Sequence, residues 1–157
     1  MLPIQKVVCP TDFSDFSYEA LDQAGELAAH FGAQMCVLHV VQPMQNVYPF
    51  AAFGGFVVSD ETAYDEAVKK SAEEELKQLI ERHSFANVRV RALVRSGYPA
   101  EEIVAAAQEE NADLIVIATH GLSGWRQYFF GSVAEKVLRL AHCPVLVTRV
   151  EKPQEGA

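Results

Sequence analysis

The chain has 157 residues, of which half are hydrophobic and 22% are charged, and its formal net charge is −8. This composition is typical of a globular protein, and the length predicts a single domain over residues 1–157 that buries roughly 70% of the unfolded surface. The acidic balance argues against binding to nucleic acid or to an anionic membrane, since both rely on clustered Lys and Arg. Without a signal peptide pattern or an apolar run long enough to span a membrane, we expect a cytoplasmic protein.

Strand and helix patterns alternate along the chain. Short apolar runs rich in β-branched residues predict strands, and apolar side chains spaced three and four residues apart predict helices. The strands are expected at 6–9, 34–41, 88–94, 114–118 and 145–150, and the helices at 15–31, 61–83, 99–110 and 132–140. The long apolar connection 43–59 is expected to cover a ligand, a partner or the domain itself, and the polar tail 151–157 is expected to fray.

Residues that start and stop helices support these boundaries. Ser14 or Asp15 is expected to cap the first helix, and Gly32 is expected to end it. Phe31 falls on the apolar stripe of this helix, which predicts that it is buried. Asn111 is expected to end the helix 99–110 in a left-handed conformation. The three cysteines, Cys9, Cys36 and Cys143, lack metal-site spacing and are interpreted as buried, reduced thiols.

Strands that alternate with helices predict an α/β fold. A single parallel sheet with helices on both faces follows, because each parallel crossover must pass over one face of the sheet. In such sheets, ligands bind beyond the carboxyl ends of the strands. The segments 10–12, 39–41 and 118–121 lie at these ends and are expected to converge.

The segment 113–140 carries the strongest functional signal. A buried strand is followed by a loop that contains Gly121, Gly124 and Gly131, and then by a helix. Glycines allow a close approach to backbone amides, and a helix N-terminus attracts anions, so this unit predicts a phosphate site. It is not a P-loop, because no Lys precedes Ser132. One helix face is expected to hold Val133, Val137, Leu138 and Leu140.

Several motifs together resemble the universal stress protein family. The nucleotide-binding members of that family carry Gly-x-x-Gly, nine residues and Gly-Ser/Thr, and this chain reads Ala-Thr-His-Gly from Ala118, nine residues and Gly-Ser at Gly131. Pro-Thr-Asp-Phe-Ser from Pro10, Leu-His-Val from Leu38 and Cys-Pro-Val-Leu-Val from Cys143 are similar too. The resemblance covers the chain up to Arg149 and implies a Rossmann-like, five-stranded sheet in the order 3-2-1-4-5.

The resemblance also implies an ATP-binding protein that responds to stress through nucleotide occupancy. A magnesium or manganese ion would arrive with the nucleotide. The implied binding residues are Pro10, Thr11, Asp12, Val40, Ala118, Thr119, His120, Gly121, Gly131, Ser132 and Val133. With the implied strand order, the apolar strand Val145 to Val150 is an edge, which predicts a homodimer through this strand.

Other interpretations of these residues remain open. Asp12 either contacts a ligand or caps the turn before the first helix, and His120 is either a polar wall or a catalytic base. Ser132 and Glu135 have capping-box spacing, so the hydroxyl of Ser132 either bonds its own helix or contacts a ligand. No catalytic residue is assigned. Ala118, where the family has glycine, is the sequence support for an interaction module without nucleotide, and slow ATP hydrolysis is a further alternative.

Overall fold

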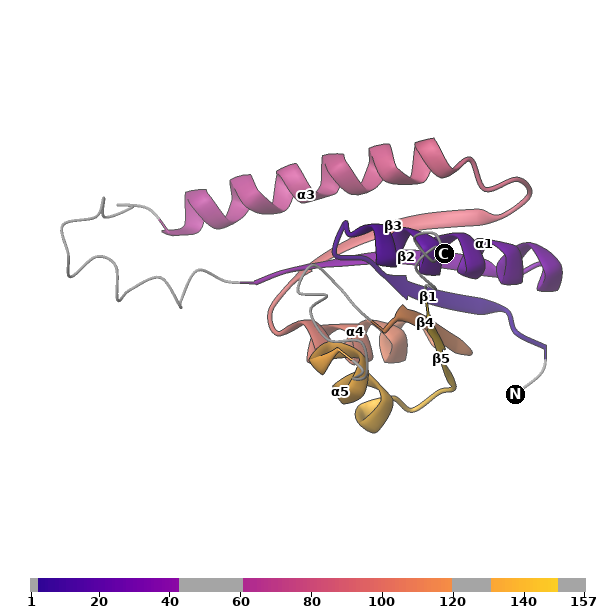
Figure 1. The fold of residues 1–157 in the computed structure, drawn as a ribbon. Helices are drawn as coiled ribbons and strands as arrows, with labels where there is room; N and C mark the ends of the chain where they lie inside the picture. The colour runs from indigo at the N-terminus through magenta and orange to yellow at the C-terminus, as the bar shows by residue number, and fades with distance from the viewer. Residues whose placement is uncertain (1–2, 43–60, 120–130, 150–157) are drawn as a thin grey trace, which may run out of the picture.

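The computed structural model describes residues 3–42, 61–119 and 131–149. Strands and helices alternate in the order β1 (Lys6–Pro10), α1 (Asp15–Phe31), β2 (Gln34–Val41), α3 (Glu61–His83), β3 (Arg89–Ser96), α4 (Pro99–Glu109), β4 (Leu114–Ala118), α5 (Ser132–Leu140) and β5 (Val145–Thr148). The strands form one parallel sheet in the order β3-β2-β1-β4-β5 (Figure 1). The predicted α/β fold and its strand order are therefore confirmed. The connection 43–59 and the tail 151–157 lie outside the described residues.

The ends of the helices follow the local sequence. Ser14 is the N-cap of α1, and its side chain accepts a hydrogen bond from the amide of Ser17. Gly32 ends α1 at φ +66°, a conformation that glycine adopts without a steric cost. Asn111 has φ +52° directly after the C-cap of α4. The three predicted helix boundaries are confirmed.

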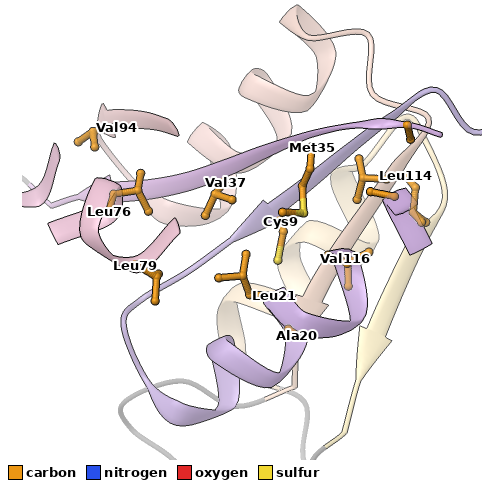
Figure 2. Packing of buried hydrophobic residues seen from close by; sticks show 14 of the residues in the cluster. Cys9, Ala20, Leu21, Met35, Val37, Leu76, Leu79, Val94, Leu114 and Val116 are labelled. Atoms are coloured by element: carbon orange, nitrogen blue, oxygen red, sulfur yellow. The ribbon is translucent and has the colours of Figure 1, made fainter. Parts of the chain in front are cut away.

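The sheet separates two apolar cores because successive side chains of a strand point to opposite faces. One core packs Cys9, Met35, Val37 and Val116 of the strands against α1 and α3 (Figure 2). The other packs Val8, Cys36, Leu38, Ile115 and Ile117 against α4 and α5. Helices thus cover both faces, as the alternating sequence pattern predicts (Figure 1).

Three apolar side chains that were expected inside are substantially exposed. Phe31 is 37% exposed, Leu138 41% and Leu140 49%. Phe31 and Leu140 are the last residues of their helices, where contact with the sheet ends. Leu138 follows the buried Val137 by one position and is rotated by about 100° away from the core. The prediction that these side chains are buried is wrong.

The described cysteines are free thiols. Cys9 and Cys36 are buried, and burial raises the pKa of both thiols. Cys143 is partly exposed, so the prediction of a buried thiol is wrong at this position. Within the described ranges, no helix combines the length and the apolar character needed to cross a bilayer.

The two edges of the sheet differ in chemistry. β3 carries Arg89, Arg91 and Arg95 along one edge, and β5 carries Leu146, which is 40% exposed, along the other. Arg95 bonds Glu102 and Glu109 of α4 at 2.7 Å each and thereby holds this helix against the sheet.

Candidate functional site

A cavity of about 370 Å³ opens at the carboxyl edge of the sheet, where β1, β2 and β4 end and α4 and α5 begin. The predicted site residues that line it are Pro10, Thr11, Asp12, Val40, Ala118, Thr119, Gly131, Ser132 and Val133. His120 and Gly121 lie outside the described residues. The segments that were expected to converge at this edge therefore do so in the part of the chain that the structure describes.

The turn after β1 is fixed by buried hydroxyl groups. The hydroxyl of Thr11 lies 2.8 Å from that of Ser17 and accepts a hydrogen bond from the amide of Phe13 at 3.0 Å. The amide of Thr11 donates to the carbonyl of Leu38 at 2.8 Å, so the turn is also tied to β2. Phe13 adopts φ +62°, which is unusual for an aromatic residue and reflects the tightness of this turn.

Asp12 stabilises the entrance to α1. Its Oδ1 accepts hydrogen bonds from the amide of Ser14 at 3.1 Å and from the hydroxyl of Ser14. This is the local bonding that favours aspartate in turns. The capping role of Asp12 is confirmed, and the same residue lines the cavity.

His39 links β2 to the turn after β1. Its Nδ1 lies 2.8 Å from the carbonyl oxygen of Thr11. A carbonyl oxygen only accepts, so Nδ1 carries the proton of this bond. The imidazole ring also packs against the ring of Phe13, with 4.4 Å between centroids. His39 lines the cavity but is absent from the predicted site residues, although its segment was expected at this edge.

Ala118 ends β4 in a regular strand conformation. It pairs with Thr148 of β5 and is not among the described residues with positive φ. A methyl group at this position therefore causes no backbone strain. The next residue, Thr119, donates its amide to the carbonyl of Thr148 at 3.0 Å, and its own carbonyl accepts from the amide of Gly131 at 2.6 Å. This last bond places the start of α5 beside the end of β4.

The N-terminus of α5 opens into the cavity without a side-chain cap. Gly131 is the N-cap and Ser132 is already the first helical residue, so the capping-box alternative for Ser132 and Glu135 is wrong. The carboxylate of Glu135 pairs with Arg139 instead, at 2.8 Å. Amides of the first turn have no carbonyl partner within their own helix. Ser132, Val133 and Ala134 line the cavity, and their backbone amides form a natural site for an anion.

Other lining residues were missed by the sequence analysis. They are Ser17, Leu38, His39, Gln42, Pro99, Ile103, Ile117 and Ala134. Pro99 and Ile103 come from the first turns of α4, which starts at the carboxyl end of β3. The rule that ligands bind at the carboxyl ends of strands could have found Pro99, because Gly97 and Pro99 follow directly on β3.

The lining of the cavity combines apolar side chains with backbone amide donors. Leu38, Val40, Ile103 and Ile117 provide apolar walls that suit a flat aromatic ring. The start of α5 provides amide donors, and Asp12 is the one charged side chain among the described lining residues. Within the described part of the chain, no three His, Cys, Asp or Glu side chains are grouped closely enough to hold a metal ion.

Comparison with known proteins gives consistent results. Universal stress protein MJ0531 of Methanocaldococcus jannaschii is 38% identical over 154 residues, which cover 96% of this chain and 84% of that protein. Universal stress protein YxiE of Bacillus subtilis is 35% identical over 92% of this chain and 98% of that protein. The solved structure of the hypothetical protein MJ0577 superposes with a TM-score of 0.78 over 96% of this chain and 99% of that one, at 24% identity.

Two structural neighbours contain nucleotides. A universal stress protein in complex with cAMP has a TM-score of 0.64 and 27% identity over 93% of this chain and 97% of that one. The Archaeoglobus fulgidus universal stress protein in complex with dAMP has a TM-score of 0.54 and 26% identity over 94% of this chain and 98% of that one. The sequence profile of the universal stress protein family matches residues 3–149. The chain therefore belongs to the universal stress protein family.

Proposed function

We propose that this protein binds ATP in the cavity at the carboxyl edge of the sheet and acts as a nucleotide-dependent stress-response protein. The observation that carries the proposal is the position of the uncapped N-terminus of α5, which opens into a cavity that also has apolar walls. The cAMP and dAMP complexes of two structural neighbours support a nucleotide as the ligand.

The proposed roles of the lining residues follow from their chemistry. Val40 would pack on adenine, and Pro10, Thr11 and Asp12 would line the adenosine pocket, where the Asp12 carboxylate would accept a hydrogen bond from ribose or base. Ala118, Thr119, His120 and Gly121 would approach the ribose and phosphates. Gly131, Ser132 and Val133 would hold the phosphate chain through amides at the start of α5. The magnesium or manganese ion would be carried by the nucleotide.

A module that does not bind nucleotide was the alternative suggested by Ala118. Ala118 has a strand conformation, so its methyl group causes no backbone strain. Because Ala118 also lines the cavity, the affinity of an Ala118→Gly variant for ATP tests whether the methyl group hinders the ligand. Slow hydrolysis of ATP by a bound water molecule is compatible with the proposal, but no described side chain is assigned as a catalytic base.

The direct test is thermal unfolding and calorimetry with ATP and magnesium, with cAMP and AMP as comparison ligands. A ligand at about 100 times its Kd adds about 2.7 kcal/mol to the free energy of unfolding, which is readily seen as a rise in Tm. Millimolar ATP that leaves Tm unchanged would contradict the proposal.

The role of the α5 amides is tested by a pair of substitutions at one position. Ser132→Pro removes the first amide donor, whereas Ser132→Ala keeps the amide and removes only the hydroxyl. Proline is favoured at the first helical position, and Gly131 has ψ 146°, which suits a residue before proline, so the helix is expected to survive. We expect Ser132→Pro to weaken ATP binding about tenfold, the size of one charge-assisted hydrogen bond. Equal affinities of the two variants would exclude this amide as a phosphate donor.

We also propose that the protein forms a homodimer through β5. β5 is an edge strand, and its Leu146 side chain is 40% exposed. An apolar edge of this kind offers unpaired backbone groups to a second copy of the same strand.

A further inference from the structure

A second cavity lies at the opposite, amino edge of the sheet. It has a volume of about 210 Å³, and its lining includes Lys6, Gln34, Cys36, Arg89 and Arg91. Lys6, Gln34 and Arg89 are the first residues of β1, β2 and β3, and they are in register with one another. Arg91 follows Arg89 by two positions on β3 and so lies on the same face of the sheet. The strands therefore bring three basic residues, Lys6, Arg89 and Arg91, to one opening, remote in the sheet from the carboxyl-edge cavity.

The basic side chains of this cavity exceed its acidic ones. Glu110 is the one carboxylate among the described lining residues, and it pairs with Arg91. The ammonium group of Lys6 donates to the backbone carbonyl of Glu110 at 2.8 Å, which satisfies a helix end but neutralises no charge. Arg89 forms no ion pair with another described residue. The lining thus carries a formal charge of about +2 in a chain of net charge −8.

The thiol of Cys36 lies among these charges. Cys36 is 6% exposed and lines the cavity. Burial raises the pKa of this thiol most. The charge of Arg91 acts to lower it, the charge of Glu110 acts to raise it, and the charge of Lys6 acts more weakly to lower it. The sulfur atom is therefore close to both cations, and a ligand bound between them would cover it.

We propose that the amino-edge cavity binds a small phosphate monoester through Arg89, Arg91 and Lys6. A dianion matches the uncompensated charge of the lining. Guanidinium groups bind phosphate oxygens in pairs of parallel hydrogen bonds, which an ammonium group alone cannot do. The volume is below the roughly 300–1,000 Å³ of sites for drug-sized ligands, so the ligand is a compact one with few carbons.

The existing ion pair does not account for the cluster. The side chain of Arg91 is 58% exposed in its pair with Glu110, and exposed pairs contribute little to stability. A pair of this kind rearranges at low cost when a stronger anion enters.

Cys36 supplies a reporter that is specific to this cavity. The rate of its alkylation by iodoacetamide is measured by peptide mass spectrometry in sodium glycerol 2-phosphate, in inorganic phosphate and in sodium chloride at equal ionic strength. We expect the phosphate monoester to slow labelling of Cys36 severalfold and to leave Cys143 unchanged. A stronger effect of the monoester than of inorganic phosphate identifies the ester as the ligand. Phosphate bound at the start of α5 would not protect Cys36, so this test is independent of the proposed nucleotide site.

Two substitutions and a matched control complete the test. Arg89→Gln removes one phosphate contact, and Arg89 is not among the charges that shift the Cys36 pKa, so the unprotected labelling rate is expected to stay the same. The concentration of monoester that gives half protection is expected to rise about tenfold. Glu110→Gln, which removes the opposing charge, is expected to lower this concentration; because Glu110 also shifts the Cys36 pKa, protection in this variant is measured against its own rate in sodium chloride. Arg82→Gln on exposed α3 makes the same change in net charge and is expected to have no effect.

Two results would overturn the proposal. The first is equal labelling of Cys36 in the monoester and in sodium chloride. The second is an Arg82→Gln variant that loses protection as much as Arg89→Gln does, since this would show a general effect of protein charge.

Discussion

Gly97 is a residue at which an added side chain would meet both an unfavourable backbone conformation and a close neighbour. It has φ +153°, and a Cβ placed there would lie 2.7 Å from both Cγ and Oε1 of Glu102. Glu102 is itself held by Arg95, so it cannot move aside without losing an ion pair. We expect Gly97→Ala to lower the free energy of unfolding by about 3 kcal/mol, from backbone strain together with the displaced ion pair. Urea unfolding measures this change.

Gly32 provides the matched comparison for Gly97. It also has a positive φ, of +66°, but a Cβ there would meet no atom within 4 Å. Gly32→Ala is expected to cost only about 1 kcal/mol, from the left-handed conformation alone. Equal losses in the two variants would show that the contact with Glu102 has no energetic consequence.

Glu109 gives a prediction about pH. Its hydrogen bond to Arg95 lowers the pKa of its carboxyl from the ordinary value of 4.5. Because the pKa is lower in the folded state, the ionised carboxylate stabilises the protein at pH values above 4.5. This stabilisation is lost as the pH falls through the lowered pKa of the folded state. Glu109→Gln should therefore be less stable than the wild type at pH 7. At a pH below the lowered pKa of Glu109, where the wild-type carboxyl is protonated, the two proteins should be equally stable. Urea midpoints across this range measure the difference.

A control for Glu109 lies on α3. Glu81→Gln removes the same charge from an exposed residue that forms no ion pair within the described ranges. Its stability difference from the wild type should not depend on pH in this way. A matching pH dependence of both variants would assign the effect to net charge.

Single residues also mark the limit of what the sequence could predict. Asp12 could be assigned to a turn because aspartate bonds to amides two residues further on, and the structure shows this bond to Ser14. Ser132 could not be placed correctly, because the spacing to Glu135 fits a capping box while the first helical residue is set by backbone geometry at Gly131. His39 was missed because its bond to the Thr11 carbonyl joins β2 to the turn after β1, and these segments lie apart in the sequence.

Among the helices, α3 has a narrow attachment to the sheet. Its buried side chains within the described residues are Ala72, Leu76 and Leu79, and much of its remaining surface is exposed. Leu76→Ala, at a fully buried position, is expected to lower the free energy of unfolding by about 2–5 kcal/mol. Val68→Ala, one turn before Ala72 and only half-buried, is expected to cost about 1 kcal/mol or less. Similar losses in both variants, measured by urea unfolding, would contradict a narrow attachment.

The secondary structure was largely predictable because each strand and helix has its own apolar period. β2, α3 and β4 have the predicted bounds, and β5 ends at Thr148 instead of at Val150. The packing of helix ends was less predictable, because periodicity does not show how far the sheet extends below a helix. Leu140 illustrates this, since it lies at the end of α5 and is 49% exposed.

For the whole molecule, the test of the proposed dimer is the backbone of β5. The carbonyl groups of Pro144 and Thr148 accept bonds from β4, so alternate residues, including Val147, direct their backbone groups to the free edge. Val147→Pro should therefore remove a donor from the dimer contact while it leaves the ladder to β4 intact. We expect a monomer by light scattering, with the circular dichroism of a folded protein.

The control for this substitution is Val147→Ala. It shortens the same side chain but keeps the amide, so the variant should remain a dimer. Wild-type protein that is monomeric at micromolar concentration would refute the dimer. A monomeric Val147→Ala variant would assign the contact to the side chain instead of the backbone.

The unequal edges of the sheet bear on how large the assembly can become. If β5 of one copy paired with β3 of the next, every copy would expose a new β5, and the chain of molecules would grow into an open filament. The arginines of β3 place charge on that edge, which is how natural sheets discourage unwanted pairing. In the proposed dimer, growth would then be confined to the apolar side, where two copies would meet about a twofold axis and leave no free β5 edge for a third.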